Sequence, residues 1–248
     1  MRSRYPSSST FAYSFGPGPL TPAIKAIVAA NVAVFLISWF VAAIKLTFGL
    51  SPSDIFGRLH VWQPVTYMFL HEGTFHILFN MLALWMFGVE LERTWGSRYF
   101  LKYYFVCGVG AAMTTVLLSF LPGTFGQQLY YSLTIGASGA VYGVLLAYAM
   151  YFPNRPIYMY FVFPIPAKYF VAIIGAISLL SSTGGGGGIA HTTHLGGLLA
   201  GYLYLKGGRI HLLSEVKYRY LKWRINRMRR KFDVYSGGRA DDVNRRVH

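Results

Sequence analysis

A hydroxyl and an imidazole open two long apolar segments of the chain. Ser138 lies in the sequence GASG and His194 in the sequence HLGG. If both segments are helices that enter a bilayer from the same side, the two side chains lie at the same shallow depth. A ring nitrogen within hydrogen-bond reach of a hydroxyl can take its proton and activate the oxygen as a nucleophile. The pair therefore predicts a serine hydrolase site inside a membrane.

The composition agrees with a membrane setting. Of the 248 residues, 54% are hydrophobic and 12% are charged, and the mean hydropathy is +0.41. A typical soluble domain carries roughly 25% charged residues, so this chain has too few charges to coat a water-facing surface. Because the apolar residues come in long blocks, the sequence predicts a helical protein with several membrane spans.

Six blocks have the composition of membrane-spanning helices. The first, 26–44, is uncharged and has the roughly 20-residue length that crosses a bilayer. The others are 74–91, 98–120, 136–152, 168–183 and 189–206. The expected fold is all-α, a bundle of six transmembrane helices. The connection 45–72 mixes charged and aromatic residues, which places it at the lipid headgroups.

The two ends of the chain differ from this predicted domain, which extends over 22–206. Residues 1–21 are rich in Ser, Pro and Gly and are expected to form a flexible tail. Residues 207–248 alternate apolar and basic side chains, which predicts an amphipathic helix on an anionic cytoplasmic leaflet. Nucleic-acid binding is the weaker interpretation, and no nucleic-acid partner is expected, because cytoplasmic tails of membrane proteins are basic in any case.

The charges of the connections predict the orientation. If the amino terminus is cytoplasmic, the cytoplasmic connections hold most of the Lys and Arg, and the opposite ones hold only Lys45 and Arg58. Both termini then face the cytoplasm, and Ser138 and His194 lie toward the outer side.

Further polar residues are expected at the same depth. His76 and Asn80 are four residues apart, on one face of the helix that begins near residue 74, and Tyr142 lies one turn below Ser138. Polar side chains at membrane depth are costly and tend to face the interior of a bundle. Their convergence from separate helices indicates a functional site.

Small residues spaced by four predict which helices touch. The segment after Ser138 carries Gly139 and Gly143, and the segment after His194 carries Gly197 and Gly201. Such stripes let helix backbones approach closely. The approach would bring the Ser138 hydroxyl within reach of the imidazole.

No acidic residue is available to complete a catalytic triad, because none falls within a helix near His194. The sequence predicts a Ser–His dyad, with the ring of Tyr142 packed against His194. His191, three residues earlier, lacks the Leu-Gly-Gly that follows His194 and is expected at the outer surface. His71 is expected to serve packing or hydrogen bonding.

Taken together, three motifs resemble those of the rhomboid intramembrane serine proteases of the prokaryotic six-span type. They are HEGTFHILFN at 71–80, GASGAVYG at 136–143 and HLGGLLAG at 194–201, and the resemblance covers about residues 22–206.

This resemblance implies Ser138 as the nucleophile and His194 as the general base, with His76, Asn80 and the Ser138 backbone N–H holding the oxyanion. Gly136 and Gly139 belong to the same motif as supporting residues. It also implies transmembrane protein substrates that enter laterally, a bacterial cytoplasmic membrane, and no metal or other cofactor.

Three other functions remain open from the sequence. A metalloprotease would need the histidines of HExxH, whereas His71 and His76 are five residues apart, which turns the second ring away from a shared metal. A non-catalytic relative of the proteases would be marked by loss of the serine or histidine. A transporter is disfavoured, because charged residues at membrane depth are missing. Separately, the glycine run 184–188 is interpreted either as a lid or as a tolerant linker.

Overall fold

The computed structural model describes residues 16–41, 43–159, 163–182, 188–207, 220–223, 225 and 227. The chain divides into two compact units, Met1–Leu205 and Lys206–His248. In the second unit, residues 220–223 are helical, and Arg227 lies over the ring of Trp223. Most of the predicted amphipathic tail lies outside the described residues, as do residues 1–15 and 184–187.

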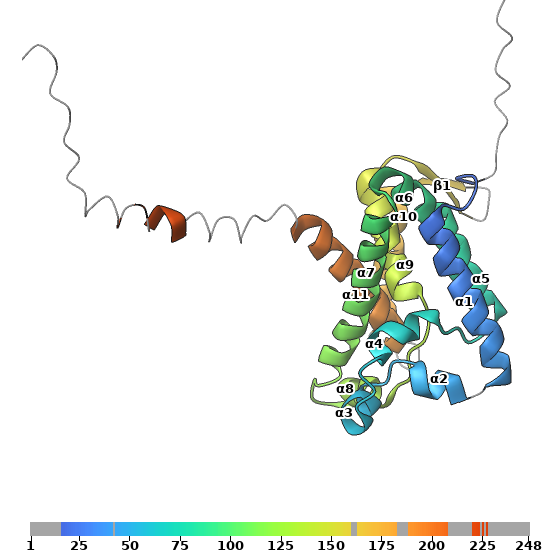
Figure 1. Ribbon diagram of the computed structural model, residues 1–248, viewed down its shortest axis with the longest axis vertical. Helices are drawn as coiled ribbons and strands as arrows, with labels where there is room; N and C mark the ends of the chain where they lie inside the picture. The colour runs from blue at the N-terminus through green and yellow to red at the C-terminus, as the bar shows by residue number, and fades with distance from the viewer. Residues whose placement is uncertain are drawn as a thin grey trace, which may run out of the picture. The chain divides into compact units, whose positions relative to one another are not determined.

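Long helices side by side make up the first unit, which confirms the all-α expectation (Figure 1). They are α1 (Pro22–Phe40), α5 (Thr74–Ala83) continued by η2 (Leu84–Gly88) and α6 (Val89–Trp95), α7 (Ser97–Leu118), α9 (Ser138–Tyr151), α10 (Ala167–Ser182) and α11 (Gly188–Gly207). Among the described residues, three helical segments are long and apolar enough to cross a membrane: 22–40, 74–95 and 97–118. The helices α9 and α10 are apolar but shorter, so the count of six spans stays a prediction.

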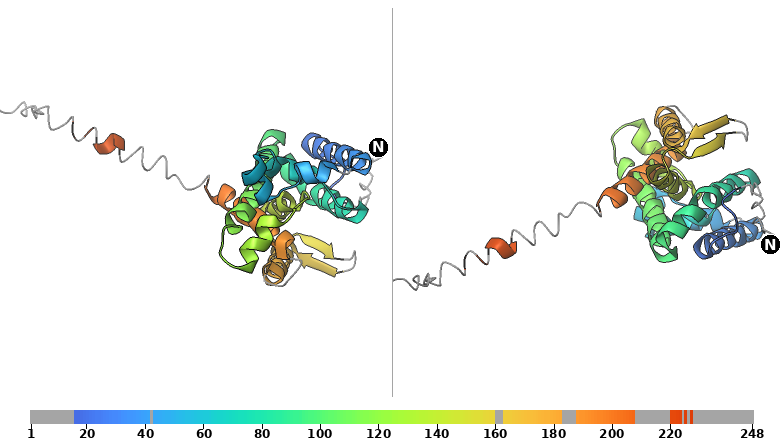
Figure 2. Two further views of the ribbon diagram at one scale, coloured as in Figure 1. Left: turned by 90° about the horizontal axis from the view of Figure 1, so that it is seen from below. Right: turned by 90° about the horizontal axis from the view of Figure 1, so that it is seen from above.

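Short elements cover the two ends of this bundle. At one end lie α2 (Ala43–Phe48), α3 (Pro52–Arg58), α4 (Gln63–Thr66) and α8 (Thr124–Tyr131) (Figure 1). At the other end, β1 (Pro156–Met159) pairs antiparallel with β2 (Phe163–Pro166). Figure 2, which looks along the helices, shows α1 and this hairpin at different edges. The hairpin and α8 were not predicted, because short elements between spans leave little periodicity in the sequence.

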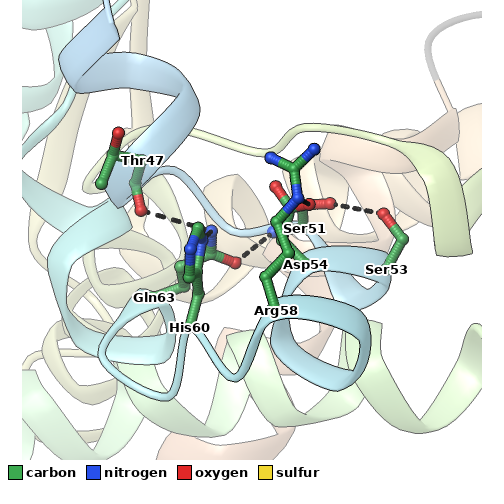
Figure 3. Close-up of polar contacts among 7 residues, drawn as sticks. All are labelled: Thr47, Ser51, Ser53, Asp54, Arg58, His60 and Gln63. Carbon is green, nitrogen blue, oxygen red and sulfur yellow. Dashed lines mark hydrogen bonds and ion pairs between the residues drawn. The ribbon is translucent and has the colours of Figure 1, made fainter.

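The connection between α1 and α5 folds around one buried amide (Figure 3). Gln63 is fully buried, and its Oε1 accepts a hydrogen bond from the Ser51 N–H at 3.0 Å. Its Nε2 donates to the Thr47 carbonyl at 3.4 Å and to His60 Nδ1 at 3.3 Å. These bonds tie α4 to α2 and α3, so the connection is an ordered structure. It ends in η1 (Tyr67–Phe69), whose Tyr67 carbonyl accepts from the Gly136 N–H just before α9.

A carboxylate joins the starts of two helices at the opposite end of the bundle. Glu92 accepts hydrogen bonds from the Ala23 N–H at 2.8 Å, the Ile24 N–H at 3.0 Å and the Ser97 hydroxyl at 2.6 Å. The Thr21 hydroxyl donates to the same carboxylate. A negative charge is favourable there, because it meets unpaired N–H groups and the positive end of the α1 dipole.

Residues 16–21, which the sequence assigned to the flexible tail, contact η2 and α6. Trp85 Nε1 donates to the Gly18 carbonyl at 2.9 Å, and Arg93 donates to the Pro17 carbonyl at 2.6 Å. Gly18 has a φ of +90° and Gly16 a φ of +83°, a conformation that glycine adopts without strain.

Candidate active site

Ser138 and His194 meet at the starts of two helices. Ser138 is the first residue of α9, and His194 lies in the second turn of α11. The distance between His194 Nε2 and Ser138 Oγ is 2.8 Å, a hydrogen bond between residues 56 apart in sequence. Both side chains are half-buried. A nitrogen at this distance can accept the hydroxyl proton.

The glycines of α9 and α11 explain how the two residues come this close. A Cβ on Gly197 would lie 1.9 Å from the Gly139 carbonyl oxygen, and one on Gly201 would lie 3.3 Å from Gly143 Cα. Both helices advance by four residues between these two contacts, so their glycine stripes face each other in register. This is the close approach that the spacing predicts.

The His194 ring is held from one side by an aromatic ring. Tyr142 stacks on it with a centroid distance of 4.2 Å and an interplanar angle of 10°. The Tyr142 hydroxyl accepts a hydrogen bond from the Ser178 hydroxyl of α10 at 3.3 Å. His194 Nδ1 is buried and has no hydrogen-bond partner among the described residues. Stacking therefore positions the ring on this side, and no carboxylate of the described residues bonds to Nδ1.

The side chains of His76 and Ser138 both lie close to Gly136. A Cβ on Gly136 would lie 2.7 Å from His76 Nε2 and 3.7 Å from Ser138 Oγ. Gly136 also has a φ of +128°, which side-chain-bearing residues rarely adopt. Glycine is thus required twice, by the backbone conformation and by the space that the imidazole occupies.

Asn80 lies on the same helix, one turn from His76. Its Nδ2 donates to the His76 carbonyl oxygen at 2.8 Å, and its side chain is 7% exposed. The amide is therefore engaged with its own helix in this structure. It must turn to donate a hydrogen bond elsewhere.

A second histidine is packed behind His76. The rings of His71 and His76 lie edge to face, with centroids 4.9 Å apart. His71 is fully buried, and neither ring nitrogen has a hydrogen-bond partner among the described residues. Burial, together with the neighbouring His76, lowers the pKa of His71 to about 4, so its ring is neutral at neutral pH. Within the described part of the chain, no three His, Cys, Asp or Glu side chains form a metal-binding cluster.

One contact beside the dyad was not anticipated from the sequence. The hydroxyls of Thr115, on α7, and Thr193, next to His194, are hydrogen-bonded at 2.9 Å, and both side chains are buried. A threonine in an apolar helix usually bonds to its own backbone, so the sequence carried no signal for a bond between helices. His191 packs edge-on against His194, with centroids 5.7 Å apart.

Comparisons with known proteins agree with the motifs. The Rhomboid domain family matches residues 58–208. The chain is 32% identical to Rhomboid protein 1, mitochondrial, of Saccharomyces cerevisiae over 55% of this chain and 38% of that protein. It is 29% identical to rhomboid protease GluP of Bacillus subtilis over 63% of this chain and 28% of that protein. It is also 29% identical to rhomboid protease AarA of Providencia stuartii over 57% of this chain and 54% of that protein. The matches thus cover between about a quarter and about half the length of these relatives.

Proposed function

The chain belongs to the rhomboid family, and we propose that it is an intramembrane serine protease that cleaves transmembrane proteins with Ser138 and His194. The single observation that carries this proposal is the 2.8 Å contact between His194 Nε2 and Ser138 Oγ. The two helices that carry these atoms, α9 and α11, are rich in apolar residues, as membrane helices are. GluP and AarA, which match this chain, are named as rhomboid proteases.

The first half of the reaction forms an acyl-enzyme. His194 Nε2 takes the hydroxyl proton while Ser138 Oγ attacks the scissile carbonyl carbon, and the carbonyl electrons move to its oxygen. As the carbonyl re-forms, the C–N bond breaks and the imidazolium gives its proton to the departing amine. In the second half, His194 deprotonates a water molecule that attacks the ester, and the proton returns to Ser138 as the acid product leaves.

The oxyanion is held by donors from α5 and from the start of α9. His76 Nε2, when it carries its proton, points to the same region as Ser138 Oγ, since both approach Gly136. The Ser138 N–H is the second donor. Asn80 becomes the third when its amide turns away from the His76 carbonyl, to which it is bonded in the absence of substrate.

Substrates enter laterally between α5 and α10 in this proposal. Toward the start of α5, Phe75 and Phe79 are 74% and 63% exposed. Leu180, near the end of α10, is 74% exposed. At the other ends of the two segments, the rings of Phe87 and Phe170 stack with centroids 6.5 Å apart. The pair of helices is therefore joined at one end and has exposed apolar side chains at the end where Ser138 lies.

We further propose a cell membrane with both termini in the cytoplasm and the dyad toward the outer side. The basic segment 207–248 would then meet the anionic cytoplasmic leaflet. The relatives include bacterial and mitochondrial proteins. A bacterial cytoplasmic membrane is the proposed location, and a mitochondrial membrane is the alternative.

Cleavage of a model transmembrane substrate by purified, reconstituted protein tests the proposal. Wild type should cleave, and Ser138→Ala and His194→Ala should not. The controls are Ser119→Ala, a buried serine bonded to the Val116 carbonyl, and His60→Ala in the first connection; both should cleave. Cleavage by Ser138→Ala at the wild-type rate would overturn the dyad. Loss of wild-type cleavage on adding a chelator would favour the metalloprotease, and binding of substrate without cleavage would favour the non-catalytic relative.

A further inference from the structure

An apolar groove lies between α9, α10 and α11, and its lining does not include Ser138 or His194. Its volume is about 600 Å³. Its lining comes from the end of α9, the beginning of α10 and the middle of α11, and includes Leu146, Lys168, Gly175, Leu195, Leu198 and Tyr202. Of these residues, Leu195 directly follows His194 in the chain. The groove therefore adjoins the proposed active site along α11 without including the dyad.

The lining of the groove includes one positively charged side chain, that of Lys168. Lys168, the second residue of α10, is the only charged side chain among the described residues that line the groove. Its ammonium lies 5.0 Å from the centroid of the Tyr169 ring, and no carboxylate forms a salt bridge with it among the described residues. Arg155, which lies between α9 and α10, is also positively charged, but it forms an ion pair with Glu90. Within the part of the chain that the structure describes, Lys168 thus offers a charge without a counterion in the lining of an apolar groove.

We propose that this groove binds an anionic phospholipid, with its acyl chains along α10 and α11 and its phosphate on Lys168. The charge complementarity between the Lys168 ammonium and a lipid phosphate carries the assignment. A lysine at the end of an apolar helix extends its ammonium toward the headgroup region. The leaflet that such a residue faces under the predicted orientation is the cytoplasmic one, which is rich in anionic lipid.

From Lys168 to Gly175 the groove follows α10 for about 10 Å at 1.5 Å per residue. Acyl chains can lie along this length without displacing α10.

Gly175 gives a way to close the groove without disturbing its walls. A Cβ there would lie 3.4 Å from Leu198 Cδ1, an ordinary van der Waals distance. A leucine at this position would therefore extend into the groove. Gly175→Leu and Lys168→Gln remove the apolar and the charged part of the site separately.

The test is lipid binding by the full chain purified in detergent, and it does not depend on protease activity. Short-chain phosphatidylglycerol or phosphatidylcholine is titrated, and retained lipid is counted by native mass spectrometry alongside the thermal midpoint. Wild type should retain phosphatidylglycerol in preference and gain stability from it. Lys168→Gln should lose about fivefold in affinity for phosphatidylglycerol, the factor expected for one basic residue at an anionic lipid, with phosphatidylcholine unchanged. Gly175→Leu should weaken both lipids.

The matched control is Lys102→Gln, which removes another exposed lysine, one that lies over the Tyr204 ring outside the groove. Its preference for phosphatidylglycerol should equal that of wild type. The proposal is overturned if Lys168→Gln binds phosphatidylglycerol as wild type does, or if Lys102→Gln loses as much affinity. A protein dimer that forms without lipid and dissociates in Gly175→Leu would assign the groove to a second copy and overturn it as well.

Discussion

The two ends of the helical bundle differ in how fully their buried polar groups are hydrogen-bonded. At one end, the carboxylate of Glu92 accepts hydrogen bonds from two backbone N–H groups and two hydroxyls. At the other end, His194 makes one hydrogen bond among the described residues, to Ser138, and its second ring nitrogen is buried without a partner among them. Both groups are costly in an apolar environment, but only Glu92 is compensated in full.

This difference separates polar residues that hold the fold from those available for chemistry. A fully bonded carboxylate stabilises the native state, and its partners are left unpaired when it is removed. A hydroxyl and an imidazole with spare hydrogen-bond capacity contribute less to stability but can bind a substrate and move a proton. The comparison predicts that substitutions at the two ends affect different quantities.

Outside the dyad, the largest effect is expected at the proposed oxyanion donors. His76→Ala should lower kcat by about 10²-fold or more, because one preorganised donor is lost from the transition state. Asn80→Ala should have a similar effect if its amide turns toward the oxyanion. KM for a transmembrane substrate should change little, and the thermal midpoint should stay near that of wild type. An unchanged kcat in both variants would remove these residues from the proposed mechanism.

Glu92→Ala is expected to lower stability and to leave activity unchanged. Unfolding free energy should fall by about 3 kcal/mol, because charge-assisted hydrogen bonds to α1 and α7 are lost and their donors are left unpaired. Activity per folded molecule should be retained. The control is Glu90→Gln, whose partner Arg155 is half-exposed, so its ion pair should contribute less than about 1 kcal/mol. Reversible unfolding in mixed micelles measures both, and equal losses would contradict the comparison.

His71 predicts a pH dependence of stability. Its folded-state pKa of about 4 lies below the ordinary value near 6.5, so the unfolded chain binds more protons between these values. The stabilisation is complete above pH 6.5 and is lost as the pH falls toward 4. Unfolding free energy should drop by about 2 kcal/mol from this residue between pH 7 and pH 5. His71→Phe should make the unfolding free energy depend less on pH between pH 7 and pH 5. If the variant shows the same pH dependence as wild type, protonation of His71 does not destabilise the fold.

The smallest effect is expected for Thr115 and Thr193, which lie beside His194, the proposed base. Thr115→Val and Thr193→Val should each lower kcat about two- to fivefold, because a buried hydrogen bond of about 1 kcal/mol helps to fix α11, and with it His194, against α7. Thr193→Ser retains the hydroxyl and should restore most of the rate. A double-mutant cycle measures the coupling, and additive losses would show that the bond does not position His194.

Long apolar blocks and glycine stripes carried most of the fold information in the sequence. They predicted long helices and the contact between α9 and α11, because lipid burial and close backbone approach both leave regular residue patterns. The hairpin and α8 left no such pattern. Helix ends were less accurate: the first span was expected at 26–44, whereas α1 ends at Phe40 and α2 follows.

Residues of the candidate site could be predicted from the sequence only where their type is rare in the surrounding segment. Ser138, His194 and His76 stand out as polar residues in apolar helices, so their positions could be anticipated. Ser178 and Thr115 could not, because hydroxyls are common in such helices and their partners depend on how the helices are rotated. The same applies to Glu92, whose four hydrogen bonds come from segments far apart in sequence.

Covalent labelling of the intact protein by a fluorophosphonate, mapped by mass spectrometry, tests the central claim most directly. The proposed mechanism predicts one adduct, on Ser138, in wild type and a much slower reaction in His194→Ala, because the imidazole activates the hydroxyl. Labelling of a different residue in wild type, or equal labelling rates with and without His194, would contradict it.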